Sequence, residues 1–146
     1  MSTAAFDRVV DQYHRAAEEF IKGNPEPYKA LFSRQDDVTL GNPFGPFGRG
    51  WGQIAGIMER ASALYRDGEG FSAETISTCV TPGLAFIVEV ERFRARIAGR
   101  DELSSVALRT TSVFRPEEDG WKIMHRQADT VTTARSPESV MQHERH

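Results

Sequence analysis

Hydrophobic and polar positions follow a helical spacing in the first part of the chain. Apolar residues recur every three or four positions between residues 6 and 21, which is typical of a helix with one buried face. Gly23 is expected to end this helix, and Asn24 and Pro25 are residues that often begin the next one. The same spacing returns from residue 51 to residue 67. Three helices are therefore predicted, the second of them short.

From residue 71 onward the pattern changes to the alternation of β-strands. Strands are predicted at about residues 71–81, 84–97 and 103–129, and the last segment is a hairpin whose polar connection contains Pro116 and the pair Asp119-Gly120. An earlier strand is predicted at residues 37–41. Helices followed by long antiparallel strands predict an α+β roll, with three N-terminal helices packed on a strongly curved sheet.

The apolar side of the strand at residues 84–97 changes face midway along the alternation. We expect a β-bulge here, because one extra residue reverses the alternation and bends the strand. Glu89 and Glu91 stand at the crossover, and they are either solvated outer residues or acids that point inward. Their charge favours the outer position.

The second strand of the hairpin places five chemically different residues on one face. Side-chain direction alternates along a strand, so this face carries Trp121, Ile123, His125, Gln127 and Asp129. It is apolar at one end and hydrogen-bonding at the other, as in the wall of a ligand cavity.

Charged residues on the hairpin could form a reactive site on this wall. Arg109 lies among apolar positions of the first hairpin strand and needs an acidic partner, for which Glu91 is the candidate. His125 suits proton transfer near neutral pH, and Asp129 could polarise a ligand or a water held between them. The alternative is an ordinary Arg–Glu pair with a hydrogen-bonded histidine in the core. A change of hairpin register by one residue would separate Arg109 from His125.

Residues 42–50 are rich in glycine and proline, and regular structure is not expected there. Their spacing does not match a phosphate-binding motif. Three large rings, Phe44, Phe47 and Trp51, lie in or just after this loop. They either cover the mouth of a cavity or plug one end of the core, because leaving them in water is costly.

The composition fits one globular domain, at residues 1–132, followed by a polar tail at residues 133–146. The chain is 39% hydrophobic and has a formal net charge of −3 with both signs mixed, so neither a nucleic acid nor a membrane is the expected partner. No run of about 20 apolar residues indicates a membrane span, and the N-terminus lacks the apolar core of a signal peptide. We therefore expect a cytoplasmic protein.

Neither a metal nor a cofactor is expected from the motifs in the chain. His143 and His146 fall in the polar tail, His14 lies at the edge of the first helical stripe, and no group of residues has the spacing of a zinc site. The single cysteine excludes an internal disulfide.

Three segments resemble the nuclear-transport-factor-2-like superfamily, and within it the SnoaL-like and ketosteroid-isomerase-like branch of bacteria. They are LF…DDVTLGNPFG, the GRGW before the third helix, and LRTTSVFRPEEDGWKIMHRQAD, within a similarity that spans residues 4–132. The resemblance implies a cone-shaped roll in which the curved sheet wraps around a deep pocket. It also implies a homodimer formed through the outer face of the sheet.

The resemblance bears on the chemistry as well. In the steroid isomerases a general-base aspartate precedes a proline after the first strand, and the matching residue here is Asn42 before Pro43. An amide cannot accept a proton at neutral pH, so ketosteroid isomerisation is not expected. Tyr13 lies in a setting similar to that of the tyrosine that supplies a hydrogen bond to the oxyanion in those enzymes.

Two classes of function follow. One is a cofactor-independent isomerase, dehydratase or hydrolase acting on a small apolar oxygenated compound, with His125, Asp129, Arg109 and Tyr13 as catalytic candidates. The other is a non-catalytic protein that binds such a ligand, or a dimeric interaction module. In either class the expected ligand-binding residues are Asn42, Phe44, Phe47, Trp51, Glu91, Trp121 and Gln127.

Overall fold

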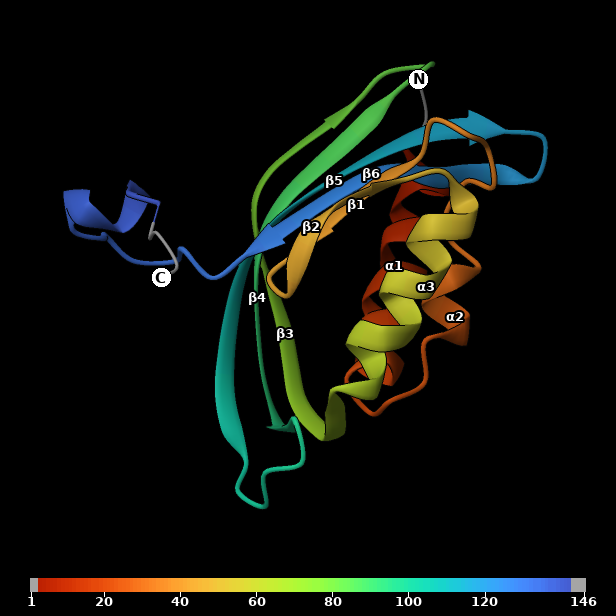
Figure 1. Cartoon of the computed structure of the whole chain (residues 1–146). Coiled ribbons are helices and arrows are strands. Elements are labelled where there is room, and N and C mark those ends of the chain that lie inside the picture. The colour runs from red at the N-terminus through yellow and green to blue at the C-terminus, as the bar shows by residue number, and fades with distance from the viewer. Residues whose placement is uncertain (1–2, 143–146) are drawn as a thin grey trace.

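Three helices pack against one face of a six-stranded sheet, which curves around them without closing (Figure 1). The computed structural model describes residues 3–142. The helices are α1 (Ala4–Phe20), α2 (Glu26–Lys29) and α3 (Trp51–Ala63). The strands are β1 (Thr39–Asn42), β2 (Gly45–Arg49), β3 (Tyr65–Val80), β4 (Ala85–Ile97), β5 (Ser104–Glu117) and β6 (Gly120–Asp129). This arrangement confirms the predicted α+β roll.

The sheet runs in the order β2-β1-β6-β5-β4-β3. Every neighbouring pair is antiparallel except β1 and β6, which are parallel. The four strands from β3 to β6 follow one another along the chain as the predicted hairpins require. A short 3₁₀ helix, η1 (Pro137–Val140), lies in the C-terminal segment, away from the sheet and the helices (Figure 1).

The apolar face of α1 lies at the centre of the core. Phe6, Val9 and Tyr13 are all buried on this face, as the helical spacing predicted. The ring of Phe6 meets the ring of Phe114 on β5 edge-on, with 5.1 Å between the centroids. Aromatic rings contribute large buried areas, so these contacts fix α1 over the β5–β6 end of the sheet.

Residues 45–49 form a strand, so the expectation of an irregular loop there is wrong. β2 pairs antiparallel with β1, with Thr39 opposite Arg49 and Asn42 opposite Gly45. The strand lies at the edge of the sheet, where Pro46 needs no hydrogen-bonding neighbour on its second side. The hairpin places Phe44 and Phe47 beside α3 rather than in an open loop.

β4 keeps a strict alternation, so the bulge predicted in it is also wrong. Its register with β5 is unbroken from Ala85 to Ala95. The register shifts lie instead in β3, at three places between Arg66 and Ser77. Because β4 does not change face, Glu89 and Glu91 point inward with its apolar residues, and both acids are buried.

A bulge does occur in β6. Phe114 faces Ile123, whereas the preceding Val113 faces His125, which leaves Met124 as the extra residue. The extra residue reverses the alternation, so Ile123 and then Arg126 both point into the core. The five residues predicted to share one face of this strand are therefore divided between its two faces.

The third helix is shorter than the predicted residues 51–67, since α3 stops at Ala63 and β3 begins at Tyr65, so Gly68 lies within a strand. Gly68 is a point of close approach between β3 and the end of α1. The Gly68 amide donates a hydrogen bond of 3.1 Å to the Ile21 carbonyl. A Cβ at this position would lie 2.3 Å from Ile21 Cγ1 and 2.5 Å from its carbonyl oxygen.

We predict that Gly68→Ala lowers the free energy of unfolding by about 1–3 kcal/mol, because the added methyl group overlaps backbone that cannot easily move. The matched control is Gly83→Ala, whose Cβ would meet open space. Urea denaturation of both variants measures the effect. Equal midpoints for the two would show that β3 does not approach Ile21 as closely as described.

Candidate functional site

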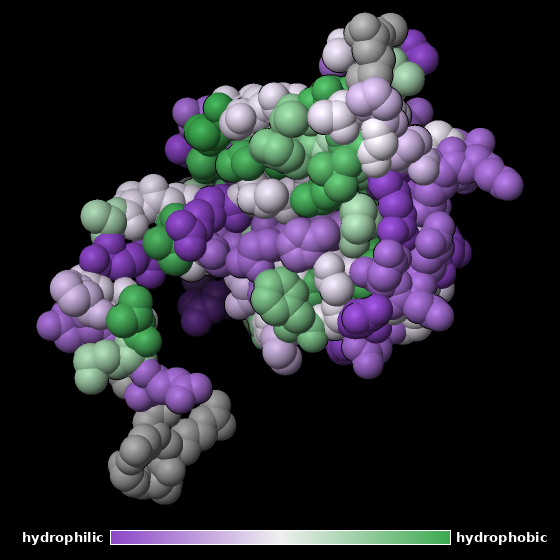
Figure 2. Space-filling view, turned by 90° about the horizontal axis from the view of Figure 1, so that it is seen from above, coloured by the Kyte–Doolittle hydropathy of each residue, from purple (hydrophilic) through white to green (hydrophobic). Residues whose placement is uncertain are grey.

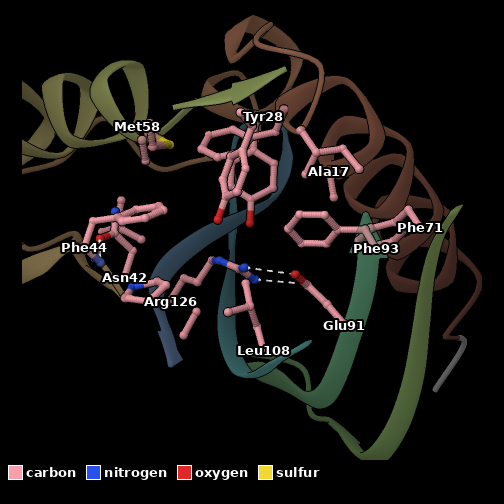
Figure 3. A pocket seen from close by; sticks show the side chains of 17 residues that line it. Ala17, Tyr28, Asn42, Phe44, Met58, Phe71, Glu91, Phe93, Leu108 and Arg126 are labelled. Atoms are coloured by element: carbon pink, nitrogen blue, oxygen red, sulfur yellow. Dashed lines mark hydrogen bonds and ion pairs between the residues drawn. The ribbon is translucent and has the colours of Figure 1, made fainter. Parts of the chain in front are cut away.

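A cavity of about 50 Å³ lies between the helices and the concave face of the sheet (Figure 3). It has room for several water molecules. Most of its wall is aromatic or aliphatic, from Tyr28, Met58, Tyr65, Phe71, Phe93 and Leu108. Asn42 and Phe44 lie at one side of the cavity, opposite Phe71 and Phe93 (Figure 3).

The polar part of this wall is an ion pair between Arg126 on β6 and Glu91 on β4. Each guanidinium Nη donates to one carboxylate oxygen at 3.2 Å, and the two side chains are 9% and 3% exposed. Their strands are separated only by β5, so the long arginine side chain reaches across one strand. A buried charge of either sign is costly, and this pairing is what makes both tolerable.

Two tyrosines and a serine complete the surroundings of the ion pair. Arg126 Cζ lies 5.6 Å from the ring centre of Tyr13 and 5.5 Å from that of Tyr28, distances at which an aromatic face attracts a cation. The Tyr13 hydroxyl accepts a hydrogen bond from Arg126 and lies 2.8 Å from Ser112 Oγ and 3.3 Å from Glu91 Oε2.

The site offers hydrogen-bond donors that remain protonated at neutral pH. Burial is the largest single influence and lowers the pKa of Arg126, but the charge of Glu91, the two neighbouring tyrosines and the hydrogen bond to Glu91 together outweigh it, so this pKa lies well above its ordinary value. Burial raises the pKa of Tyr28 well above its ordinary value and that of Tyr65 to about 12. Donors from Arg126 and Tyr28 suit a carbonyl, hydroxyl or carboxylate oxygen, whereas Glu91 is the only acid among the described residues that line the cavity.

A second buried acid lies on the same face of β4. Glu89 is fully buried, and both of its carboxylate oxygens lie 2.9 Å from His14 Nε2 on α1. Thr75 donates to Glu89 Oε2 at 3.3 Å. Neither Glu89 nor His14 lines the cavity, so this pair joins α1 to the sheet beside the site rather than within it.

Four of the predicted site residues lie on the outer face of the sheet and not in the cavity wall: Arg109, His125, Gln127 and Asp129. Arg109 donates to Asp129 Oδ1 at 2.7 Å and is exposed, and it does not pair with Glu91. His125 Nδ1 lies 2.7 Å from Thr39 Oγ1, and Gln127 donates to Asp129. The bulge at Met124 turns His125, Gln127 and Asp129 outward and Arg126 inward, whereas Arg109 faces outward by the regular alternation of β5.

The remaining predicted residues are divided as well. Among them Asn42, Phe44 and Glu91 line the cavity, and the Asn42 side-chain oxygen accepts from the Phe44 amide at 2.9 Å. Tyr13 is fully buried behind the cavity wall, where it holds Arg126 and Glu91. Three predicted rings do not line the cavity: Phe47 is exposed beside His125, Trp51 packs on the core beneath Arg34, and Trp121 packs against Phe6.

Arg126, Tyr28 and Ser112 were not predicted as site residues. One signal for them was present in β4, where the apolar alternation from Ala85 to Phe93 continues through both acids without interruption. Two acids that point into a core require cationic partners that also point inward. Arg126, on the second strand of the predicted hairpin, is one such cation.

Within residues 3–142, no group of three or more His, Cys, Asp or Glu side chains is placed to hold a metal ion. No helix in that range is long and apolar enough to cross a membrane. The predicted tail histidines, His143 and His146, lie outside the described residues.

Comparison with known proteins gives a family and a fold. The profile of a family described as the SnoaL-like domain matches residues 7–131. No curated protein matches the chain. Among solved structures, a candidate dehydratase of the nuclear-transport-factor-2-like family from Streptomyces avermitilis has a TM-score of 0.74 at 21% identity, over 90% of this chain and 96% of that one.

Two further structures have similar scores. A ketosteroid isomerase-like protein from Erwinia carotovora atroseptica has a TM-score of 0.73 at 14% identity, over 89% of this chain and 96% of that one. A nuclear-transport-factor-2-like protein from Salmonella enterica serovar Typhimurium has a TM-score of 0.69 at 18% identity, over 88% of this chain and 90% of that one. At these identities the likeness shows a shared fold.

We predict that Arg126→Leu lowers the free energy of unfolding by about 3–5 kcal/mol, because it leaves the Glu91 carboxylate buried without a counter-charge. The double variant Arg126→Leu/Glu91→Leu should recover much of this loss, as expected for two coupled residues. Arg109→Leu is the control and should leave the melting temperature nearly unchanged, because its pair with Asp129 is exposed. A double variant no more stable than Arg126→Leu alone would contradict the pairing.

The pair His14–Glu89 predicts a pH dependence of stability. Its hydrogen bond to Glu89 is the main cause that raises the pKa of His14 above the ordinary value of 6.5, although burial opposes the shift. Protonated His14 therefore stabilises the fold fully below that value, and this stabilisation is lost as the pH rises through the higher pKa of the folded state.

The comparison is between the wild type and His14→Gln, in thermal melts from about pH 5.5 to about pH 8.5. Glutamine can still donate to Glu89 but carries no charge. The wild type should be more stable than the variant at the acidic end, and the difference should shrink as the pH rises. A difference that stays constant over this range would mean that His14 does not titrate against Glu89.

Proposed function

The chain belongs to the SnoaL-like family, and we propose that it binds a small, largely apolar molecule in the cavity, with a carbonyl or hydroxyl oxygen of the ligand placed beside Arg126. The observation that carries this proposal is the buried ion pair in an otherwise apolar wall. A core needs no such pair, since apolar residues of similar volume are often at least as stabilising. Donors held in an apolar cavity are instead the arrangement that fixes the orientation of a ligand.

The donors that line the cavity suit an oxygen acceptor. Arg126 uses its two Nη atoms on Glu91 and Tyr13, and a guanidinium has five N–H groups in all. Tyr28 and Asn42 add a hydroxyl and an amide to the same cavity. The oxygen of Asn42 is occupied by the Phe44 amide, so its NH₂ group is the end left to donate.

A second candidate is catalysis of a proton transfer without a cofactor, as in an elimination of water or an isomerisation. It is favoured by Glu91, an acid in the cavity wall, and agrees with the names given to the Streptomyces and Erwinia proteins. Asn42, which stands where the steroid isomerases have their base, argues against the isomerase chemistry of that group. Both oxygens of Glu91 are bound by Arg126, which favours binding over catalysis as the first proposal.

We predict that p-cresol, an apolar ring with one oxygen, binds to the wild type as the exposed Phe44 moves aside, because the cavity of about 50 Å³ is by itself smaller than the ring, and that Ala128→Leu weakens this binding on the order of tenfold or more. Ala128 is buried and lines the cavity, so a larger side chain there fills the space for the ligand. Ala107→Leu, on the neighbouring strand and outside the cavity, is the control. Titration calorimetry gives the affinities, and equal affinity for all three proteins would place the bound cresol elsewhere.

We also propose that the chain forms a homodimer through the outer face of the sheet. The helices leave this face uncovered (Figure 1). It carries Phe86 and Val88 of β4 and Val113 of β5, all only half-buried, while Ile76 of β3 and Leu84 of the next turn are exposed. Figure 2, which views the end where β3 turns into β4, shows hydrophobic side chains gathered beside strongly hydrophilic ones. Exposed apolar areas of this kind often mark an interface.

Light scattering at micromolar concentration should give twice the chain mass of 16.4 kDa. Val88→Arg should reduce the mass to that of one chain, because it places a charge in the centre of the apolar area. Val140→Arg, in the C-terminal segment away from the sheet, should not. A wild-type protein that already scatters as one chain would rule out the dimer.

A further inference from the structure

A second hollow, of about 640 Å³, lies between β2 and α3. It shares Asn42, Phe44 and Ala61 with the cavity, so the two spaces are separated by little more than these side chains. Phe44 is 47% exposed and stands at the edge of the cavity in Figure 3. Its ring contacts the ring of Tyr65, with 5.7 Å between the centroids. Phe44 therefore separates the inner cavity from the outer hollow.

The outer hollow has an apolar wall that water contacts. Phe47, also in this wall, is 63% exposed, so two large rings remain in solvent beside the entrance to the cavity. Gly48 and Gly56 let side chains of α3 lie directly on the backbone of this wall, because a Cβ at Gly48 would lie 2.4 Å from Ile57 Cδ1 and one at Gly56 would lie 3.0 Å from Arg60 Nη1. An apolar ligand body would cover the exposed rings.

The two spaces differ in charge. In the inner cavity the charges of Arg126 and Glu91 compensate each other. Among the described residues that line the outer hollow, Arg60 carries the only formal charge, and no carboxylate within residues 3–142 forms an ion pair with it. The neighbouring acid on α3, Glu59, is paired with Lys29 at 2.6 Å. The outer hollow is therefore positive, whereas the inner cavity is neutral.

We propose that the two spaces form one continuous site for an elongated molecule with a carboxylate at one end. The carboxylate pairs with Arg60 in the outer hollow, the apolar body lies along Phe44 and Phe47, and the other end enters the cavity beside Arg126. A guanidinium binds a carboxylate with two parallel hydrogen bonds, which suits this end of the molecule. The inference rests on the proposed function, since it requires a ligand in the cavity.

The test uses 3-phenylpropanoate and its uncharged counterpart 3-phenylpropanamide, which have the same apolar body. Calorimetry should show that the wild type binds the acid about three- to tenfold more tightly than the amide, the range for a partly exposed charge-assisted pair. Arg60→Gln should remove this preference, because binding of the acid weakens more than binding of the amide. The control Arg100→Gln, in the turn after β4, should keep it. Saturation with p-cresol should weaken binding of the acid, because the two ligands meet at Phe44.

The outcomes separate the two proposals. If p-cresol binds in the cavity but the acid and the amide bind equally well, or if Arg60→Gln keeps the preference, the continuous site is wrong and the proposed function stands. Independent binding of p-cresol and the acid would overturn the continuity in the same way. If none of the three compounds binds to the wild type, both proposals fail.

Discussion

The buried ion pair of Arg126 and Glu91 is the interaction on which the site depends. It joins β6 to β4 across β5. Neither charge is tolerable alone in a core, so the two strands must keep the register that brings them together. Tyr13 hydrogen-bonds to both members of the pair and thereby links it to α1, and Ser112 hydrogen-bonds to Tyr13. A buried polar network of this kind favours one arrangement of its elements over others that are equally apolar.

Glu89, the other buried acid of β4, also has a cationic partner, but on a different element. Glu89 has its cationic partner on α1, in His14, whereas Glu91 has its partner on β6. The core face of one strand therefore holds two charges, and each requires a contact with a different element. The difference in solvent access decides their roles. His14 is 26% exposed and is accessible to water, while Arg126 lines the cavity and keeps its proton because its pKa is raised.

The sequence was sufficient to predict the three helices and most of the strands, but not β2 and not the faces of the hairpin strands. Periods of 3.6 and 2 residues placed the three helices, the meander and the closing hairpin, because burial of one face imposes those periods directly. The bulge at Met124 was not predictable from β6 alone, since it depends on how β5 pairs with it. Because of this one extra residue, Arg126 lies in the cavity wall and His125 lies outside it. β2 was missed because its glycines and proline are tolerated only at the edge of a sheet, and no local pattern tells which strand lies there.

The central claim is that Arg126 is a buried cation that meets the ligand. The most direct measurement is the exchange of guanidinium protons with solvent, followed by nuclear magnetic resonance with and without p-cresol. The account predicts slowly exchanging signals from Arg126 that shift when p-cresol binds, and rapidly exchanging signals from the exposed Arg109 that do not shift. The account would be contradicted if the signals of Arg126 exchanged as rapidly as those of Arg109 and did not shift when p-cresol is added.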